Sequence, residues 1–117
     1  MMKMLTAGLA ICLLSSSVYA GEWSQSGYTS DYRVFSSSNG SVVFASLSSL
    51  DSTYNQQICG NSNNAGQFSF YIFEDVTSKG LMSILLSAEL ANRQVQVYLT
   101  GNCTQNRPEI NGARIVG

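Results

Sequence analysis

The chain of 117 residues contains no histidine, and this absence removes the most common activating group of hydrolytic enzymes. Ser–His–Asp and Cys–His nucleophiles both depend on an imidazole that takes up a proton near neutral pH. A Ser–Lys pair is another nucleophilic arrangement, and Ser78 beside Lys79 offers one. Because Lys79 lies where a helix is predicted to begin, we expect its ammonium group to be solvated rather than catalytic.

Paired carboxylates offer a second route, which is the hydrolysis of glycosides. Glu74 and Asp75 are adjacent, and neighbouring residues at the end of a strand point to opposite sides. We expect this pair to lie at the start of the helix, where negative charge favours the helix dipole. The other acidic residues have no spacing that brings them together, and the sequence has no calcium-loop or phosphate-loop motif. The sequence therefore predicts a protein that is not an enzyme and that has no metal site and no cofactor.

Residues 1–20 have the three-part pattern of a secretory signal peptide. A basic start with Lys3 precedes an uncharged, mostly apolar run over residues 5–14, and Ala20 places a small residue at the expected cleavage position. The apolar run is too short to cross a bilayer as a stable helix. We therefore predict cleavage near Ala20, a secreted or periplasmic location, no membrane insertion, and one domain of residues 21–117.

Cleavage would remove Cys12 and leave two cysteines, Cys59 and Cys103. An even pair in a small exported domain predicts a disulfide. Two free buried thiols are the alternative. The predicted bond would join the loop before the third predicted strand to the loop after the fourth.

The charge of the chain argues against two classes of partner. The sequence has six basic and seven acidic residues, and Lys3 would leave with the signal peptide. No segment contains the basic cluster that is needed to neutralise phosphates or to hold an anionic membrane surface. We expect no nucleic-acid binding.

A β-rich pattern surrounds one helix. Short strands are predicted at residues 31–35, 41–47, 67–73, 95–99 and 110–116, with polar segments and loops between them. Asn39–Gly40 between the first two strands is a strong hairpin signal, because both residues tolerate positive φ. The loops are predicted at residues 59–66 and 101–108, and residues 48–57 are polar and ambiguous.

The helix is the most clearly predicted element. Its apolar stripe repeats at helical spacing, and Thr77 or Ser78 is expected to cap it. The stripe consists of Leu81, Ile84, Leu85 and Ala88. The whole pattern predicts a β-rich α+β fold in the order β-β-β-α-β-β, which is compatible with a small Greek-key barrel of about five strands.

Aromatic residues among small polar ones suggest sugar binding. An aromatic ring stacks on the C–H groups of a sugar, and hydroxyl and amide groups bond to its hydroxyls. Trp23, Tyr28, Tyr32 and Tyr54 lie among Ser, Gln, Thr and Asn residues. We expect Trp23 to fasten the N-terminal end of the domain, whereas Tyr28 and Tyr32 fit a binding role and a packing role equally well.

Two short motifs near the predicted cleavage site resemble a known family. Glu22-Trp23-Ser24 and Tyr28-Thr29-Ser30-Asp31 are similar to the N-terminal stretch of the B subunits of subtilase cytotoxin and typhoid toxin. The apolar helix followed by Val95-Gln96-Val97-Tyr98 matches that family's order of elements. The resemblance implies an OB-type barrel, a homopentamer, a toxin A subunit as a further partner, and sialylated glycans as ligands.

The same resemblance assigns a glycan-binding site to Tyr28, Ser30 and Asp31. Tyr28 would pack on the sugar ring, Ser30 would bond to the carboxylate or to a hydroxyl, and Asp31 would be an outer neighbour. The chain is shorter than the family between Trp23 and Tyr28 and lacks the aromatic-rich segment that the family carries near its helix.

The sequence thus favours an exported glycan-binding module that docks onto surface glycans or glycoproteins. The alternative is a secreted or periplasmic protein that binds another protein, or is structural, without glycan activity. In that case the edges of the sheet, or the surface around Tyr54 and residues 61–64, would form the contact.

Overall fold

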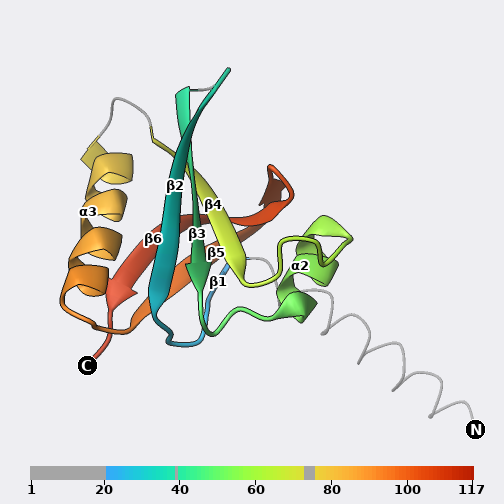
Figure 1. Ribbon diagram of the computed structural model, residues 1–117. Helices are drawn as coiled ribbons and strands as arrows, with labels where there is room; N and C mark the ends of the chain where they lie inside the picture. The colour runs from blue at the N-terminus through green and yellow to red at the C-terminus, as the bar shows by residue number, and fades with distance from the viewer. Residues whose placement is uncertain (1–20, 39, 73–75) are drawn as a thin grey trace, which may run out of the picture.

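The computed structural model describes residues 21–38, 40–72 and 76–117 (Figure 1). The predicted signal peptide and the Glu74–Asp75 pair lie outside these residues. The described fold is β-rich, as predicted, with six strands and two helices. The elements are β1 (Glu22–Trp23), β2 (Thr29–Ser37), β3 (Gly40–Leu47), α2 (Ser52–Cys59), β4 (Gln67–Ile72), α3 (Val76–Leu90), β5 (Val95–Thr104) and β6 (Arg107–Ile115).

The six strands form one sheet in the order β1-β5-β6-β4-β3-β2. All neighbours are antiparallel except β4 and β6, which run parallel and pair at Ser69 and Glu109. β1 and β2 do not pair with each other, so the sheet has two ends and the predicted closed barrel is not confirmed. Figure 1 shows α3 along one side of the twisted sheet and α2 at the other.

The segment between β1 and β2 passes from one end of the sheet to the other. Gly27 exchanges two backbone hydrogen bonds with Val95 of β5, at 2.9 and 2.8 Å. One residue later, the carbonyl of Tyr28 accepts from the N–H of Ser48, just beyond β3, at 3.0 Å. A Cβ atom on Gly27 would lie 2.8 Å from the backbone nitrogen of Ser49, so this passage requires glycine.

The core lies between the inner face of the sheet and α3. Alternate residues of each strand point inward, as the two-residue period of a strand requires, and one stripe of α3 meets them. The fully or almost fully buried members include Val43, Ala45 and Leu47 of β3, Phe68 and Phe70 of β4, Leu81, Leu85 and Ala88 of α3, and Val97 and Ile110 of β5 and β6.

The predicted helix is confirmed, but its predicted cap is wrong. α3 begins at Val76, so Thr77 and Ser78 lie inside its first turn instead of preceding it. The helix ends where Asn92 adopts a left-handed conformation with φ of 54°. There the N–H of Arg93 donates to the carbonyl of Ala88 at 2.8 Å, a common way to satisfy the last carbonyls of a helix.

Helix α2 and strand β1 are absent from the predicted order β-β-β-α-β-β. α2 is too polar to show an apolar stripe, and its two ends stabilise it instead. The side chain of Asp51 accepts from the N–H of Thr53 at 3.0 Å, and Gly60 ends the helix with φ of 77°. No helix among the described residues is long and apolar enough to cross a membrane.

The predicted loop at residues 101–108 is also wrong, because β5 and β6 form a long hairpin. β5 continues to Thr104 and β6 begins at Arg107. The two residues between them, Gln105 and Asn106, have φ of 54° and 60°. Two-residue hairpin turns of this kind favour glycine at the second position. Here that position is Asn106, so the sequence lacks the usual signal for the turn.

The predicted disulfide is confirmed. Cys59 at the end of α2 is bonded to Cys103 in β5, across 44 positions of the sequence. The bond therefore attaches the short polar helix α2 to the outer part of the β5–β6 hairpin.

We expect the double variant Cys59→Ser/Cys103→Ser to unfold at a lower urea concentration than the wild type. Loss of a link that closes a loop of this size lowers the free energy of unfolding by about 2–4 kcal/mol, because the unfolded chain regains conformational freedom. Tryptophan fluorescence during urea titration measures the change. An unchanged unfolding midpoint would show that the disulfide does not stabilise the domain.

Candidate functional site

The face of the sheet opposite the core gathers the polar and aromatic residues of four strands. We call it the outer face and define it by Ser30 and Arg33 of β2, Phe44 of β3, Gln67 of β4 and Arg107 of β6. Strand register places these residues together: Ser30 pairs with Ser46, which pairs with Gln67, and Arg33 pairs with Phe44. Val43 and Ala45 on either side of Phe44, and Phe68 beside Gln67, point into the core, so Phe44 and Gln67 point away from it.

A β-bulge in β2 keeps Ser30 and Arg33 on the same face. Three positions separate these residues, whereas their partners on β3, Ser46 and Phe44, are only two apart. Asp31 occupies the bulge with φ of 57°, and its carboxylate lies 3.7 Å from the Arg33 guanidinium. Without the extra residue, Arg33 would point into the core.

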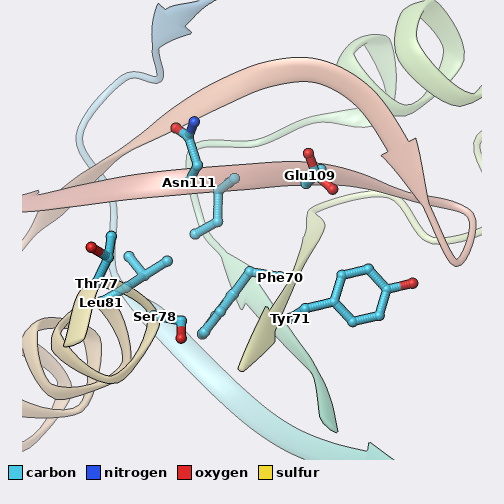
Figure 2. Close-up of a pocket in the computed structure, with 8 residues that line it drawn as sticks. Phe70, Tyr71, Thr77, Ser78, Leu81, Glu109 and Asn111 are labelled. Atoms are coloured by element: carbon cyan, nitrogen blue, oxygen red, sulfur yellow. The ribbon is translucent and has the colours of Figure 1, made fainter. Parts of the chain in front are cut away.

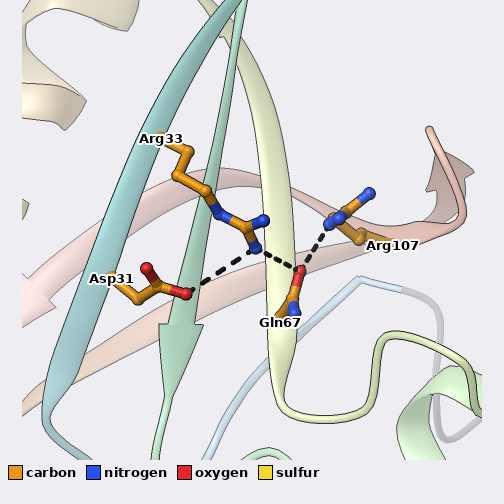
Figure 3. Close-up of polar contacts among 4 residues, drawn as sticks. All are labelled: Asp31, Arg33, Gln67 and Arg107. Atoms are coloured by element: carbon orange, nitrogen blue, oxygen red, sulfur yellow. Dashed lines mark hydrogen bonds and ion pairs between the residues drawn. The ribbon is translucent and has the colours of Figure 1, made fainter.

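The two arginines share one hydrogen-bond acceptor, as Figure 3 shows. The side-chain oxygen of Gln67 accepts from Nε of Arg107 at 2.7 Å and from Nη2 of Arg33 at 3.1 Å. A second nitrogen of Arg107 donates to the carbonyl of Gln105 at 2.8 Å. Two guanidinium groups from distant parts of the chain are therefore fixed around a single neutral oxygen.

The ring of Phe44 packs against the guanidinium group of Arg107. The guanidinium of Arg107 lies 3.7 Å from the centre of the Phe44 ring, within the range of a cation–π contact. Burial lowers the pKa of Arg107, and the positive charge of Arg33 lowers it further. Phe35 packs against Phe44 at 5.3 Å between ring centres and stays 48% exposed. The outer face thus combines concentrated positive charge with exposed aromatic surface.

The three residues predicted to bind glycan lie at the start of β2. Ser30 and Asp31 are exposed beside Arg33, on or at the edge of the outer face. Tyr28 precedes the strand, its side chain is 46% exposed, and its N–H donates to the hydroxyl of Ser48 at 2.9 Å. The structure brings Ser30 and Asp31 together with Arg33, and the contact of the Tyr28 ring with a sugar stays a prediction.

Trp23 occupies a different surface, formed by β1, β5 and β6. Its ring meets Tyr98 edge to face at 5.3 Å, and the Arg114 guanidinium lies 4.2 Å from its centre. A Cβ on Gly112 would lie 3.9 Å from the indole, so the ring covers this glycine. These contacts hold the N-terminal end of the domain against β5, which is the role expected for Trp23.

Sequence patterns alone do not single out Arg33, Gln67 and Arg107 as site residues. Alternation along the strands is a usable signal for Arg33 and Gln67, which are out of phase with the core residues of β2 and β4. Arg107 carried no such signal, because it fell in a predicted loop. Gln67 and Arg107 come together because β4 lies beside β6 in the sheet. These strands are distant in sequence, so no local pattern predicts that they are neighbours.

The remaining residues with chemically active side chains lie apart from the outer face in the described ranges. Cys59 and Cys103 are bonded, and no group of three Cys, Asp or Glu residues in the described ranges is placed to hold a metal ion. Lys79 is exposed in the first turns of α3. Tyr54, proposed for the alternative contact surface, is partly buried against the core.

The chain matches no family model, no curated protein and no solved structure. The resemblance to toxin B subunits and all that it implies therefore stays a prediction. The outer face itself is the remaining source of information on function.

Tyr32, which follows Asp31 in the bulged segment and packs against the core, makes stability sensitive to high pH. Burial raises the pKa of Tyr32 to about 12, the Thr29 hydroxyl offsets this partly, and the charge of Glu89 adds to the rise. Between the unfolded pKa of about 10 and the folded value, the folded state holds more protons than the unfolded state. Stability from this source is complete below the unfolded pKa and is lost as pH rises through that interval.

We expect the free energy of unfolding of the wild type to fall as pH rises from about 10 to 12, and Tyr32→Phe to remove most of this fall. Urea unfolding at several pH values measures both curves. Tyr28→Phe, which alters an exposed tyrosine, is the matched control and should retain the wild-type slope. Equal slopes for Tyr32→Phe and the wild type would contradict the assignment.

Proposed function

We propose that this protein is an exported glycan-binding module whose outer face recognises a sugar that carries a carboxylate. The observation that carries the proposal is the pair of guanidinium groups from Arg33 and Arg107 around one oxygen of Gln67. Gln67 is neutral, so it orients both arginines without cancelling their charge. The carboxylate of Asp31, at 3.7 Å from Arg33 and largely exposed, offsets only part of it.

The chemistry of this face fits an acidic sugar. A guanidinium group binds a carboxylate through two parallel hydrogen bonds, and Arg107 is held in one orientation by Gln67 and Phe44. Under the proposal, Ser30 bonds to the carboxylate or to a hydroxyl. Tyr28 packs on the apolar side of the ring, and Asp31 contacts the sugar from its outer edge.

We also propose that the sheet is a variant of the OB-type barrel. The support is its connectivity: if β1 and β2 count as two halves of one bent strand, the order becomes that strand, then β3, β4, β6 and β5. Gly27 and Tyr28 link the two halves to β5 and to the end of β3. OB folds are partly open barrels that bind oligosaccharides on the face of their second and third strands, and β3 and β4 would be those strands here.

Export, a homopentameric ring and a toxin A subunit complete the proposal, and the resemblance described above is their support. A ring would repeat a weak glycan site on one surface. Simultaneous contacts would then raise the overall affinity without a deep pocket in each subunit.

We expect Arg33→Ala and Arg107→Ala each to weaken binding to sialyllactose by at least about tenfold, because each removes charge-assisted hydrogen bonds to the carboxylate. Tyr28→Ala and Ser30→Ala should abolish detectable binding and leave the fold intact. Isothermal titration calorimetry with sialyllactose measures the affinity, and lactose tests the need for the carboxylate.

Arg114→Ala is the matched control, because Arg114 lies with Trp23 on the other surface. It should bind sialyllactose like the wild type. If Arg33→Ala and Arg107→Ala both bind sialyllactose with wild-type affinity, the outer face is not the binding site. If the wild type binds lactose as tightly as sialyllactose, the ligand does not need a carboxylate.

We expect the purified domain of residues 21–117, with its disulfide intact, to have the mass of a pentamer in solution. Light scattering coupled to size-exclusion chromatography measures the mass over a range of protein concentrations. A monomer at every concentration would contradict the ring, and each molecule would then bind glycan through a single outer face.

A further inference from the structure

A pocket of ≈ 240 Å³ lies between β4, β6 and the first turns of α3 (Figure 2). Phe70, Leu81 and Ile110 contribute apolar side chains from the edge of the core. Thr77 and Asn111 are exposed residues that line it from α3 and β6. An apolar interior with a few polar groups around it is the usual composition of a binding pocket.

The pocket exists because β4 and β6 pair only once. After the pair of Ser69 and Glu109, no further register connects the two strands. A second irregularity lies in β6: Leu99 of β5 pairs with Ile110, and Tyr98 pairs with Gly112, so Asn111 is an extra residue in a bulge. The edge of β6 from Ile110 onward therefore has no strand on the side that faces β4.

The one acidic side chain among the residues that line the pocket belongs to Glu109, which lies two residues after Arg107 and so on the same side of β6. Glu109 contributes a carboxylate, whose oxygens accept from the hydroxyls of Thr100 at 3.0 Å and Thr104 at 2.9 Å. No lysine or arginine is among the residues that line the pocket. The pocket thus disfavours an acidic ligand and favours a neutral or cationic one.

We propose that this pocket takes one aromatic side chain of an extended peptide segment from a partner protein. The volume accommodates a single large side chain, the commonest type of anchor at protein interfaces. The part of β6 from Ile110 onward, which pairs with no strand on the side that faces β4, offers main-chain groups to the residues that flank the anchor, as in recognition by strand addition. This inference concerns different residues from the proposed glycan site and does not depend on it.

The test uses the disulfide-bonded domain and three peptide probes, followed through the methyl signals of Leu81 and Ile110 by NMR. N-acetyl-phenylalaninamide should give saturable shifts at concentrations up to about 20 mM, whereas N-acetyl-alaninamide should not. The longer probe acetyl-Ala-Phe-Ala-amide should bind about tenfold more tightly, since its flanking amides can pair with the strand edge.

Two variants that fill the mouth of the pocket, Thr77→Trp and Asn111→Trp, should weaken probe binding at least tenfold. Ser87→Trp adds the same side chain to an exposed position farther along α3 and should bind like the wild type. Shifts that do not saturate, or that survive in both filling variants, would overturn the site. Equal affinity for the short and long phenylalanine probes would contradict a peptide ligand and would indicate that the pocket binds a small aromatic molecule instead.

Discussion

The two-residue period of β3 is the constraint on which both the core and the outer face depend. Val43, Ala45 and Leu47 point into the core, and Phe44 between them points outward beneath Arg107. A slip of one residue would exchange the two sets, because successive side chains lie on opposite faces. The burial that fixes the register of the sheet therefore also fixes the aromatic support of the candidate site, without any interaction devoted to the site itself.

The bulge in β2 allows this strand to pair with β3 while its polar side chains stay on the outer face. It adds one residue between Ser30 and Arg33, so that Tyr32 packs inward while both of its polar neighbours remain outside. The neutral amide of Gln67 then holds two guanidinium groups together. A glutamate at this position would neutralise one of them, so the amide retains the positive charge that an anionic ligand would need in a chain whose net charge is negative.

Features that follow from a local sequence pattern could be predicted. Features that depend on contacts between segments distant in sequence could not. The apolar spacing predicted α3, and an even cysteine pair predicted the bond between Cys59 and Cys103. Helix α2 escaped prediction because its caps, rather than an apolar stripe, define it. Arg107 escaped because its strand begins after a turn without glycine, and because its approach to Gln67 depends on two strands that are distant in sequence.

The single pairing between Ser69 and Glu109 lies between the outer face and the pocket. Because β4 and β6 run parallel, residues that precede this pair lie together, and residues that follow it lie together. Gln67 and Arg107 precede it and belong to the positively charged outer face, whereas the floor of the pocket follows it. The Ser69 hydroxyl donates to the carbonyl of Thr104 at 3.0 Å, and the Thr104 hydroxyl donates to Glu109 at 2.9 Å. These bonds fasten this paired position to the β5–β6 hairpin.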